Sequence, residues 1–286
     1  MRLFITNVLQ NGEGPFFKKS SLIRVPVRLG GNAFTNHKIP EVSVRHLEET
    51  MLAFKYLMKA NDVIHYKGCA TSAMREASNG PQIIKRIKQK AGVNIEIISG
   101  NTEASLIFNS QSASLGKIKK NCMFIDVGGG STEITIFSKG KPVAAKSFRI
   151  GTIRIMQGQV NKAIWKQMKE WIKSKVGNTK DFALLGSGGN INRISKLAEL
   201  KPGKPLSFDK LSDILHELKA LTFEERVKIY DLNPDRADVI IPAGEIFVTI
   251  MKWLRADKIL VPKIGLGDGI VREAYKEYLN GKKSTF

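Results

Sequence analysis

The sequence is poor in the residues that most often carry nucleophilic or metal chemistry. Its two cysteines, Cys69 and Cys122, lie in apolar strand-like runs and lack the spacing of metal ligands. This pattern predicts buried free thiols in a reducing cytosol rather than a disulfide or a catalytic thiol. The four histidines show neither a catalytic triad nor metal-ligand spacing. We therefore expect the chemistry to depend on other residue types.

Long apolar runs are also absent. No run approaches the roughly 20 residues of a membrane span, and the first residues do not have the pattern of a secretory signal. Hydrophobic residues make up 42% of the chain and charged residues 25%, as in ordinary globular proteins. We predict a cytoplasmic protein without a membrane partner, long enough for one large or two medium domains.

Acidic residues are scarce relative to basic ones. The chain has 46 Lys and Arg against 26 Asp and Glu, which gives a formal net charge of +20. The positive electrostatic potential of such a chain attracts polyanions, although a basic surface can also exist without a specific partner. The lysines are dispersed along the chain rather than gathered in an aromatic-rich stripe. We therefore favour smaller anions, such as polyphosphate or nucleotides, over nucleic acid.

The apolar patterns of the first half predict a mixed α/β domain. A turn at NGEG, 11–14, separates two strand-like runs, and a polar connection at 114–121 is the predicted domain boundary. The predicted strands are 1–9, 21–29, 62–70 and 94–98, and the predicted helices are 41–60, 80–91 and 102–115.

The second half repeats this order of elements without repeating the residues. The predicted strands are 121–127, 132–138, 142–149, 181–186 and 258–262, with a tight turn at SKGK, 138–141. The predicted helices lie at 161–176, 189–199, 208–220, 223–230 and 235–255, with a last one from 268. We therefore predict an α/β protein with two related domains, 1–115 and 116–286, that flank a cleft. The last helix is expected to pack back on the first domain.

Two carboxylates flank a glycine-rich turn in FIDVGGGSTEITIF, 124–137. Asp126 ends a buried apolar strand, where a carboxylate needs a cation or hydrogen-bond donors. Glu133 lies on the returning strand, so a hairpin would bring it near Asp126. A few carboxylates beside a phosphate suit Mg²⁺. The alternative is a glycine-rich hairpin with capping residues.

The same turn supplies donors for an anion. Gly128, Gly129 and Gly130 remove every Cβ, so the backbone N–H groups can approach an oxyanion. Ser131 and Thr132 add hydroxyl groups. We therefore predict that these five residues bind phosphate.

Weaker candidates occur elsewhere. In ATSAMREASNG, 70–80, Arg75 suits phosphate but also fits a surface pair with Glu76. In IISGNTEASLIF, 97–108, Glu103 lies in the first turn of a helix, where the helix dipole alone explains a glutamate. In KIGLGDG, 263–269, Asp268 fits an N-cap as well as a role in the cleft.

A second glycine loop occurs in ALLGSGGNINRI, 183–194. Gly186, Gly188 and Gly189 lie between a predicted strand and a helix start. Such a loop is typical of anion or nucleotide sites, but a single glycine loop is weak evidence.

These segments, in this order, resemble the exopolyphosphatase/guanosine pentaphosphate phosphatase family of the actin-like phosphotransferase superfamily. The resemblance covers nearly the whole chain, and DVGGGSTE followed by IGTIR, 150–154, is its most specific part. It implies two ribonuclease-H-like domains and hydrolysis of terminal phosphoanhydride bonds of polyphosphate or pppGpp. It also implies a cofactor, Mg²⁺ or Mn²⁺, and leaves a monovalent cation and a homodimer open.

The resemblance also assigns roles to residues. It implies that Asp126 and Glu133 lie near the metal, that Arg75 contacts phosphate, and that Glu103 is the general base that activates water. The open alternatives are a non-catalytic sensor that binds polyphosphate or pppGpp, and a kinase of the same superfamily.

One expected feature is missing at the N-terminus. Family members open with an apolar strand that ends in a first phosphate loop, and here MRLFITNV, 1–8, resembles the strand that follows it. We therefore expect the chain as given to bind polyphosphate weakly and to hydrolyse it poorly. A start placed too late is the favoured explanation, and a loss of efficient catalysis is the alternative.

Overall fold

The structure is a computed structural model that forms two compact units. One unit contains Met1–Ser110 and the segment from Leu266, and the other contains Gln111–Gly265. The description covers residues 1–12, 14–27, 29–112, 121–139, 141–176, 182–201, 203–262 and 265–281. The boundary predicted at 114–121 falls almost entirely on residues outside this description. None of the helices in the described ranges has the length and apolarity that a membrane span needs.

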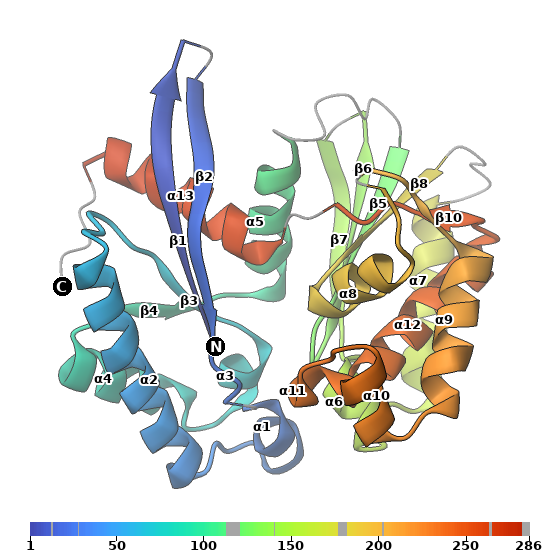
Figure 1. Cartoon of the computed structure of the whole chain (residues 1–286), viewed down its shortest axis with the longest axis horizontal. Helices are drawn as coiled ribbons and strands as arrows, with labels where there is room; N and C mark the ends of the chain where they lie inside the picture. Colours follow the sequence, from blue (N-terminus) through green and yellow to red (C-terminus); the bar gives the residue numbers. More distant parts are fainter. Residues whose placement is uncertain are drawn as a thin grey trace. The chain divides into compact units, whose positions relative to one another are not determined.

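The first unit contains two separate pairs of strands (Figure 1). β1 (Arg2–Asn11) and β2 (Gly14–Arg24) form an antiparallel hairpin, and β3 (Gly68–Ala70) runs parallel to β4 (Ile95–Ile97). The bounds predicted for the strand at 21–29 were wrong, because β2 begins at Gly14 and ends at Arg24. Within the described residues, no strand joins β1 to β3.

The helices of the first unit follow the predicted apolar spacing. α2 and α4 match the predictions at 41–60 and 80–91, and Leu47, Phe54 and Met58 form part of the buried face of α2. α13 (Leu266–Leu279) packs on β1. The ring of Phe17 in β2 lies edge to face against the ring of Tyr275 in α13, with ring centroids 5.6 Å apart. The helices are α1 (Gly30–Asn36), α2 (Glu41–Ala60), α3 (Ser72–Glu76), α4 (Gly80–Ala91), α5 (Gly100–Ser112) and α13 (Leu266–Leu279).

The contact between α5 and α13 is made at a glycine. A Cβ added to Gly269 would lie 2.0 Å from the carbonyl oxygen of Leu106, so no side chain fits between the two helix backbones. Asp268 lies in the first turn of α13 rather than at an N-cap, because the helix already begins at Leu266. Gly269 therefore sets the position of α5, the helix that carries Glu103.

Gly269→Ala is expected to destabilise the first unit by about 1–3 kcal/mol or more, since the new methyl group must displace a helix backbone. Thermal unfolding measures the loss. Gly12→Ala is the matched control, because a Cβ at Gly12 meets nothing within 4 Å. Equal melting temperatures for Gly269→Ala and Gly12→Ala would contradict the close packing of α5 and α13.

The second unit is built on a continuous sheet. β5 (Asn121–Val127), β6 (Thr132–Ser138) and β7 (Lys141–Phe148) form the predicted meander, and β8 (Phe182–Ser187) runs parallel to β5. The order is β7-β6-β5-β8. A bridge between Leu185 and Leu260 continues it next to the short β10 (Lys258–Ile259), which pairs with β9 (Leu206–Ser207). The predicted turn at 138–141 includes residue 140, which lies outside the description.

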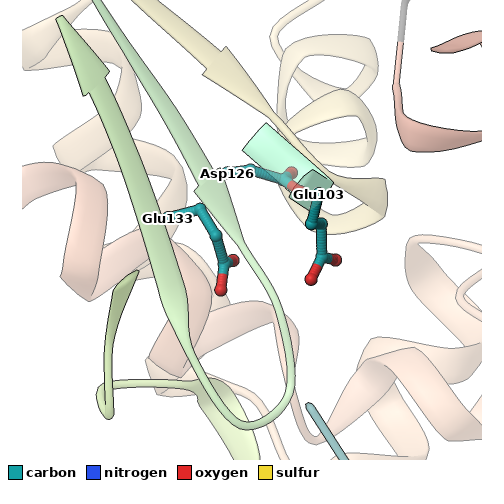
Figure 2. A group of neighbouring side chains, drawn as sticks. All are labelled: Glu103, Asp126 and Glu133. Atoms are coloured by element: carbon teal, nitrogen blue, oxygen red, sulfur yellow. The ribbon is translucent and has the colours of Figure 1, made fainter. Parts of the chain in front are cut away.

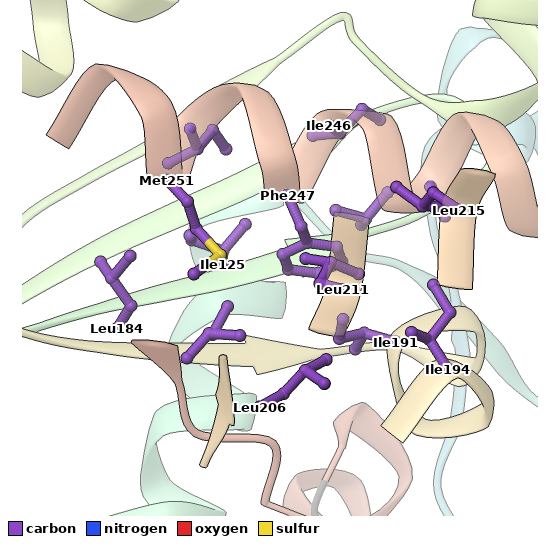
Figure 3. Close-up of a cluster of buried hydrophobic side chains, with 14 of the residues drawn as sticks. Ile125, Leu184, Ile191, Ile194, Leu206, Leu211, Leu215, Ile246, Phe247 and Met251 are labelled. Atoms are coloured by element: carbon purple, nitrogen blue, oxygen red, sulfur yellow. The ribbon is translucent and has the colours of Figure 1, made fainter. Parts of the chain in front are cut away.

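Helices cover this sheet and close its core. Figure 3 shows Phe247 and Met251 of α12 and Leu211 and Leu215 of α9 packed with Ile125 of β5. The single helix predicted at 235–255 was wrong, because the segment forms α11 and α12. The helices are α6 (Thr152–Met156), α7 (Lys162–Val176), α8 (Gly189–Leu197), α9 (Phe208–Ala220), α10 (Phe223–Ile229), α11 (Pro234–Ala237) and α12 (Ile240–Leu254).

Both cysteines are free thiols, as predicted, and Cys122 is buried whereas Cys69 is half-buried. Burial raises the pKa of Cys69 and of Cys122 to about 11. Both thiols are therefore protonated at neutral pH, and neither is activated as a nucleophile.

Candidate phosphate and metal site

The loop between β5 and β6 is held by the segment that follows β7. The carbonyl oxygens of Gly128, Gly129 and Gly130 all accept hydrogen bonds from α6. The donors are the Thr152 and Ile153 N–H groups, at 3.1 and 2.9 Å, and Arg154 Nε, at 2.8 Å. These bonds turn the three carbonyl groups toward α6, so the loop cannot present them to an anion.

Three of the N–H groups of the same loop remain available to a ligand. The Gly128 N–H donates to the Ser131 carbonyl oxygen at 2.9 Å. Those of Gly129, Gly130 and Ser131 have no hydrogen-bond partner within the described part of the chain. Successive N–H groups without partners make a concave site for an anion. This geometry supports the predicted phosphate role of the loop.

Arg154 is a residue that the sequence reasoning missed. Only 3% of it is exposed, and besides Gly130 its guanidinium group contacts Gln159 Oε1 at 3.3 Å. The pairing of DVGGGSTE with IGTIR pointed to this segment, but no local pattern showed that its arginine reaches back to the loop. Arg154 positions the loop through the Gly130 carbonyl group.

Gly151→Ala is expected to displace the loop. The added Cβ would lie 2.4 Å from the Gly129 carbonyl oxygen and 2.5 Å from the Gly130 carbonyl carbon, so the loop or α6 must move. A shift of about 1 Å at a reacting centre can lower turnover about 100-fold. Phosphate release by Gly151→Ala and by Gly12→Ala, as the control, measures this. Full turnover by Gly151→Ala would show that the contact does not shape the site.

Asp126 and Glu133 lie side by side on the sheet. They face each other across β5 and β6, so their side chains are on the same face (Figure 2). A carboxylate oxygen of each lies within 4.8 Å of the other. Glu133 is 3% exposed, and its Oε1 accepts hydrogen bonds from the Ser131 and Ser147 hydroxyl groups at 2.6 and 2.9 Å. Two carboxylates held this way are ligands that fit a hard divalent cation.

The hydroxyl groups of the loop have partners inside the protein. Ser131 Oγ donates to Glu133, and Thr132 Oγ1 donates to the Ile150 carbonyl oxygen at 2.6 Å. Thr132 is fully buried. Both hydroxyl groups therefore stabilise the hairpin through hydrogen bonds within the protein. Their contact with phosphate stays a prediction.

The second glycine loop meets the first at Asp126. Gly188 has a φ of +114°, and an added Cβ would lie 3.3 Å from Asp126 Oδ1. Gly189 begins α8. Gly186 instead faces the core, where an added Cβ would lie 3.1 Å from the Phe247 ring. Gly188 therefore allows the close approach to Asp126, while Gly186 serves packing.

The remaining candidates, Arg75 and Glu103, lie in the first unit. Arg75 Nη1 donates to the Ile98 carbonyl oxygen at 2.8 Å, two residues before α5 begins at Gly100. Ser99 Oγ accepts the Thr102 N–H at 3.0 Å and caps this helix. Glu103 follows in the first turn and is 8% exposed. The local fold thus brings the Arg75 side chain to the end of α5 that carries Glu103.

Comparison with known proteins identifies the family. The sequence model of the Ppx/GppA phosphatase family matches residues 13–277, nearly the whole chain. The chain belongs to the Ppx/GppA phosphatase family. The resemblance drawn from the motifs is therefore confirmed. The acidic pair is also compatible with a family of divalent-metal-dependent phosphatases, although the specific ion stays a prediction.

Curated relatives are distant and often longer. A bifunctional 3-dehydroquinate synthase/phosphatase of Fusobacterium nucleatum is 25% identical over 286 residues, covering 91% of this chain and 43% of its own. A putative exopolyphosphatase of Haemophilus influenzae is 26% identical, covering 71% of this chain and 65% of its own. Exopolyphosphatase 1 of Mycobacterium leprae is 20% identical, covering 82% and 75%. The chain spans less than two thirds of the first two relatives.

Solved structures share the fold. An exopolyphosphatase from Cytophaga hutchinsonii has a TM-score of 0.80 at 23% identity, covering 98% of this chain and 94% of its own. The Ppx/GppA family member of Aquifex aeolicus has a TM-score of 0.75 at 23% identity, covering 99% and 95%. The predicted α/β class and the actin-like two-domain architecture are confirmed.

Proposed function

We propose that this chain is an exopolyphosphatase, a phosphoanhydride hydrolase that removes terminal phosphate groups from inorganic polyphosphate with the help of a divalent metal ion. One observation carries the proposal. A glycine loop with its carbonyl groups bound and three N–H groups available lies beside the paired carboxylates of Asp126 and Glu133. This arrangement, in a Ppx/GppA family chain, suits a phosphate group and a cation together.

In this proposal different residues bind the metal ion, bind the phosphate group and activate the water. Asp126 and Glu133 hold Mg²⁺ or Mn²⁺, and the N–H groups of 129–131 hold the terminal phosphoryl group. When bound, the ion neutralises charge that develops on the phosphoryl oxygens. Arg75 adds a guanidinium fork for phosphate oxygens. Glu103 takes a proton from the attacking water, which general base catalysis requires.

The basic charge of the chain supports a polyanionic substrate. The net charge of +20 raises the local concentration of polyphosphate and speeds its association at low ionic strength. The same site suits pppGpp, which carries the same terminal phosphoanhydride bond. Values of kcat/KM for polyphosphate and pppGpp, compared at one salt concentration, establish which is preferred.

Metal dependence tests the proposed chemistry. Orthophosphate release from polyphosphate is measured with Mg²⁺, with Mn²⁺ and with excess EDTA. We expect release with either ion and none with EDTA, and restoration when the ion is added back in excess. Equal release in EDTA would rule out the metal-dependent mechanism.

Further predictions from the sequence still await measurement. Weak hydrolysis of polyphosphate by this chain stays a prediction, which its steady-state turnover measures. A homodimer is tested by the mass in solution. The cytoplasmic location and the monovalent cation likewise stay predictions.

A further inference from the structure

The second unit contains a groove of about 600 Å³ over α9 and α12, bounded by Ile155 of α6 and Trp165 of α7. This volume lies within the range of about 300–1,000 Å³ that is typical of small-molecule sites. The groove residues on each of the two helices recur at i, i+3, i+4 and i+7, so each helix contributes one continuous stripe. The core residues of α12, such as Phe247 and Met251, lie on another face (Figure 3).

The lining of the groove combines an aromatic and several aliphatic side chains with polar ones, which contribute the larger part of its surface. Ile155, Leu215 and Val248 supply apolar surface, and Trp165 is half-buried among them. The Trp165 ring packs edge to face against Trp253, with centroids 5.9 Å apart, which fixes its orientation. A fixed, half-exposed indole offers a stacking surface for a planar ring.

Among the described residues that line the groove, Lys252 is a lysine without a carboxylate partner. Lys219 Nζ pairs with Glu245 Oε1 at 2.6 Å, so these two charges neutralise each other. Lys252 lies on the same stripe as Glu245, two helical turns or about 10 Å along α12. Within the described ranges, Lys252 has no carboxylate partner and lies 5.9 Å from the Phe208 ring centroid. Thr249, one turn before it, adds a hydroxyl group.

We infer that this groove binds a nucleoside monophosphate. Its base lies against Trp165 over the apolar surface, and its single phosphate group meets Lys252 and the Thr249 hydroxyl group. One lysine without a carboxylate partner matches one phosphate group. The groove is made from α6, α7, α9 and α12, and it includes none of the residues assigned to the hydrolytic site.

Calorimetric titration of the whole chain with AMP tests the inference. Adenosine lacks the anion and ribose 5-phosphate lacks the base, so each is expected to bind at least about tenfold more weakly than AMP. AMP affinity should be unchanged in Asp126→Asn, since that carboxylate belongs to the other site. Equal binding of AMP and ribose 5-phosphate, or no binding of AMP, would overturn the inference.

Charge reversal at Lys252 provides a second, independent test of the groove. Lys252→Glu is expected to weaken AMP binding at least tenfold, roughly the loss of one charge-assisted hydrogen bond. Lys258→Glu changes another exposed lysine, on β10, and is the control that should bind AMP as the parent chain does. Trp165→Leu should also weaken binding about tenfold. Because Lys252 is exposed, Lys252→Glu should fold normally, so the test remains valid even if Trp165→Leu fails to fold. Unchanged affinity for AMP in Lys252→Glu would refute the site.

Discussion

Glu103→Gln is expected to lower kcat for phosphate release about 10²–10⁴-fold while KM for polyphosphate changes little. Glutamine keeps the size and hydrogen-bonding shape of the side chain but cannot accept the proton of the attacking water, a contribution of that magnitude in general base catalysis. Because Glu103 lies in a capped first turn, the substitution should leave α5 intact. Steady-state kinetics of orthophosphate release measures the effect.

The control for this variant is Glu49→Gln on α2. Glu49 is exposed and lies outside the proposed machinery, so its replacement removes the same charge without a catalytic effect. The pH–rate profile adds a second readout, because the acidic limb that a general base produces should be lost in Glu103→Gln. Equal kcat in Glu103→Gln and Glu49→Gln would show that Glu103 is not the base.

Asp126→Asn is expected to raise the Mg²⁺ concentration for half-maximal activity by about 100-fold or more. Asparagine keeps the shape beside Gly188 and opposite Glu133, but it removes the negative charge that a divalent cation needs. Loss of an outer partner of a metal ligand already costs about 10–100-fold in affinity, so loss of a ligand should cost at least the upper value. A Mg²⁺ titration of the rate measures this.

Asp213→Asn on α9 is the matched control for the metal titration. Asp213 is exposed in the same unit, and its substitution changes the net charge by the same amount. If both variants show the same Mg²⁺ dependence, the effect comes from overall charge and Asp126 is not a ligand.

The core of the candidate site could be predicted from sequence because its determinants are local. A buried strand, three glycines and a returning strand together specify the hairpin of β5 and β6, and hairpin pairing brings Asp126 opposite Glu133. The hydrogen bonds that hold this loop against α6 could not be predicted in the same way. The Arg154 to Gly130 bond joins residues 24 positions apart, and no pattern within either segment reveals it.

The wrong element boundaries have physical reasons as well. None of the residues of β2 is buried, and its first residues, GPFFKKSS, lack the apolar alternation that marks a half-buried strand. The sequence pattern therefore did not indicate where β2 begins. The helix predicted at 235–255 ran through Pro242, although proline is tolerated in the first turn of a helix and not in its interior. The new start of α12 at Ile240 places Pro242 in that first turn.

The pattern of products from polyphosphate of one defined length tests the account most directly. The chain, with Mg²⁺, should shorten the polymer one phosphate at a time from its ends, with one orthophosphate released for each unit lost. Asp126→Asn, at the same Mg²⁺ concentration, should release far less. Binding of polyphosphate by the parent chain without orthophosphate release above that of Asp126→Asn would contradict an exopolyphosphatase and would favour a sensor. Internal cleavage, in which shorter chains form without one orthophosphate for each unit lost, would also contradict it.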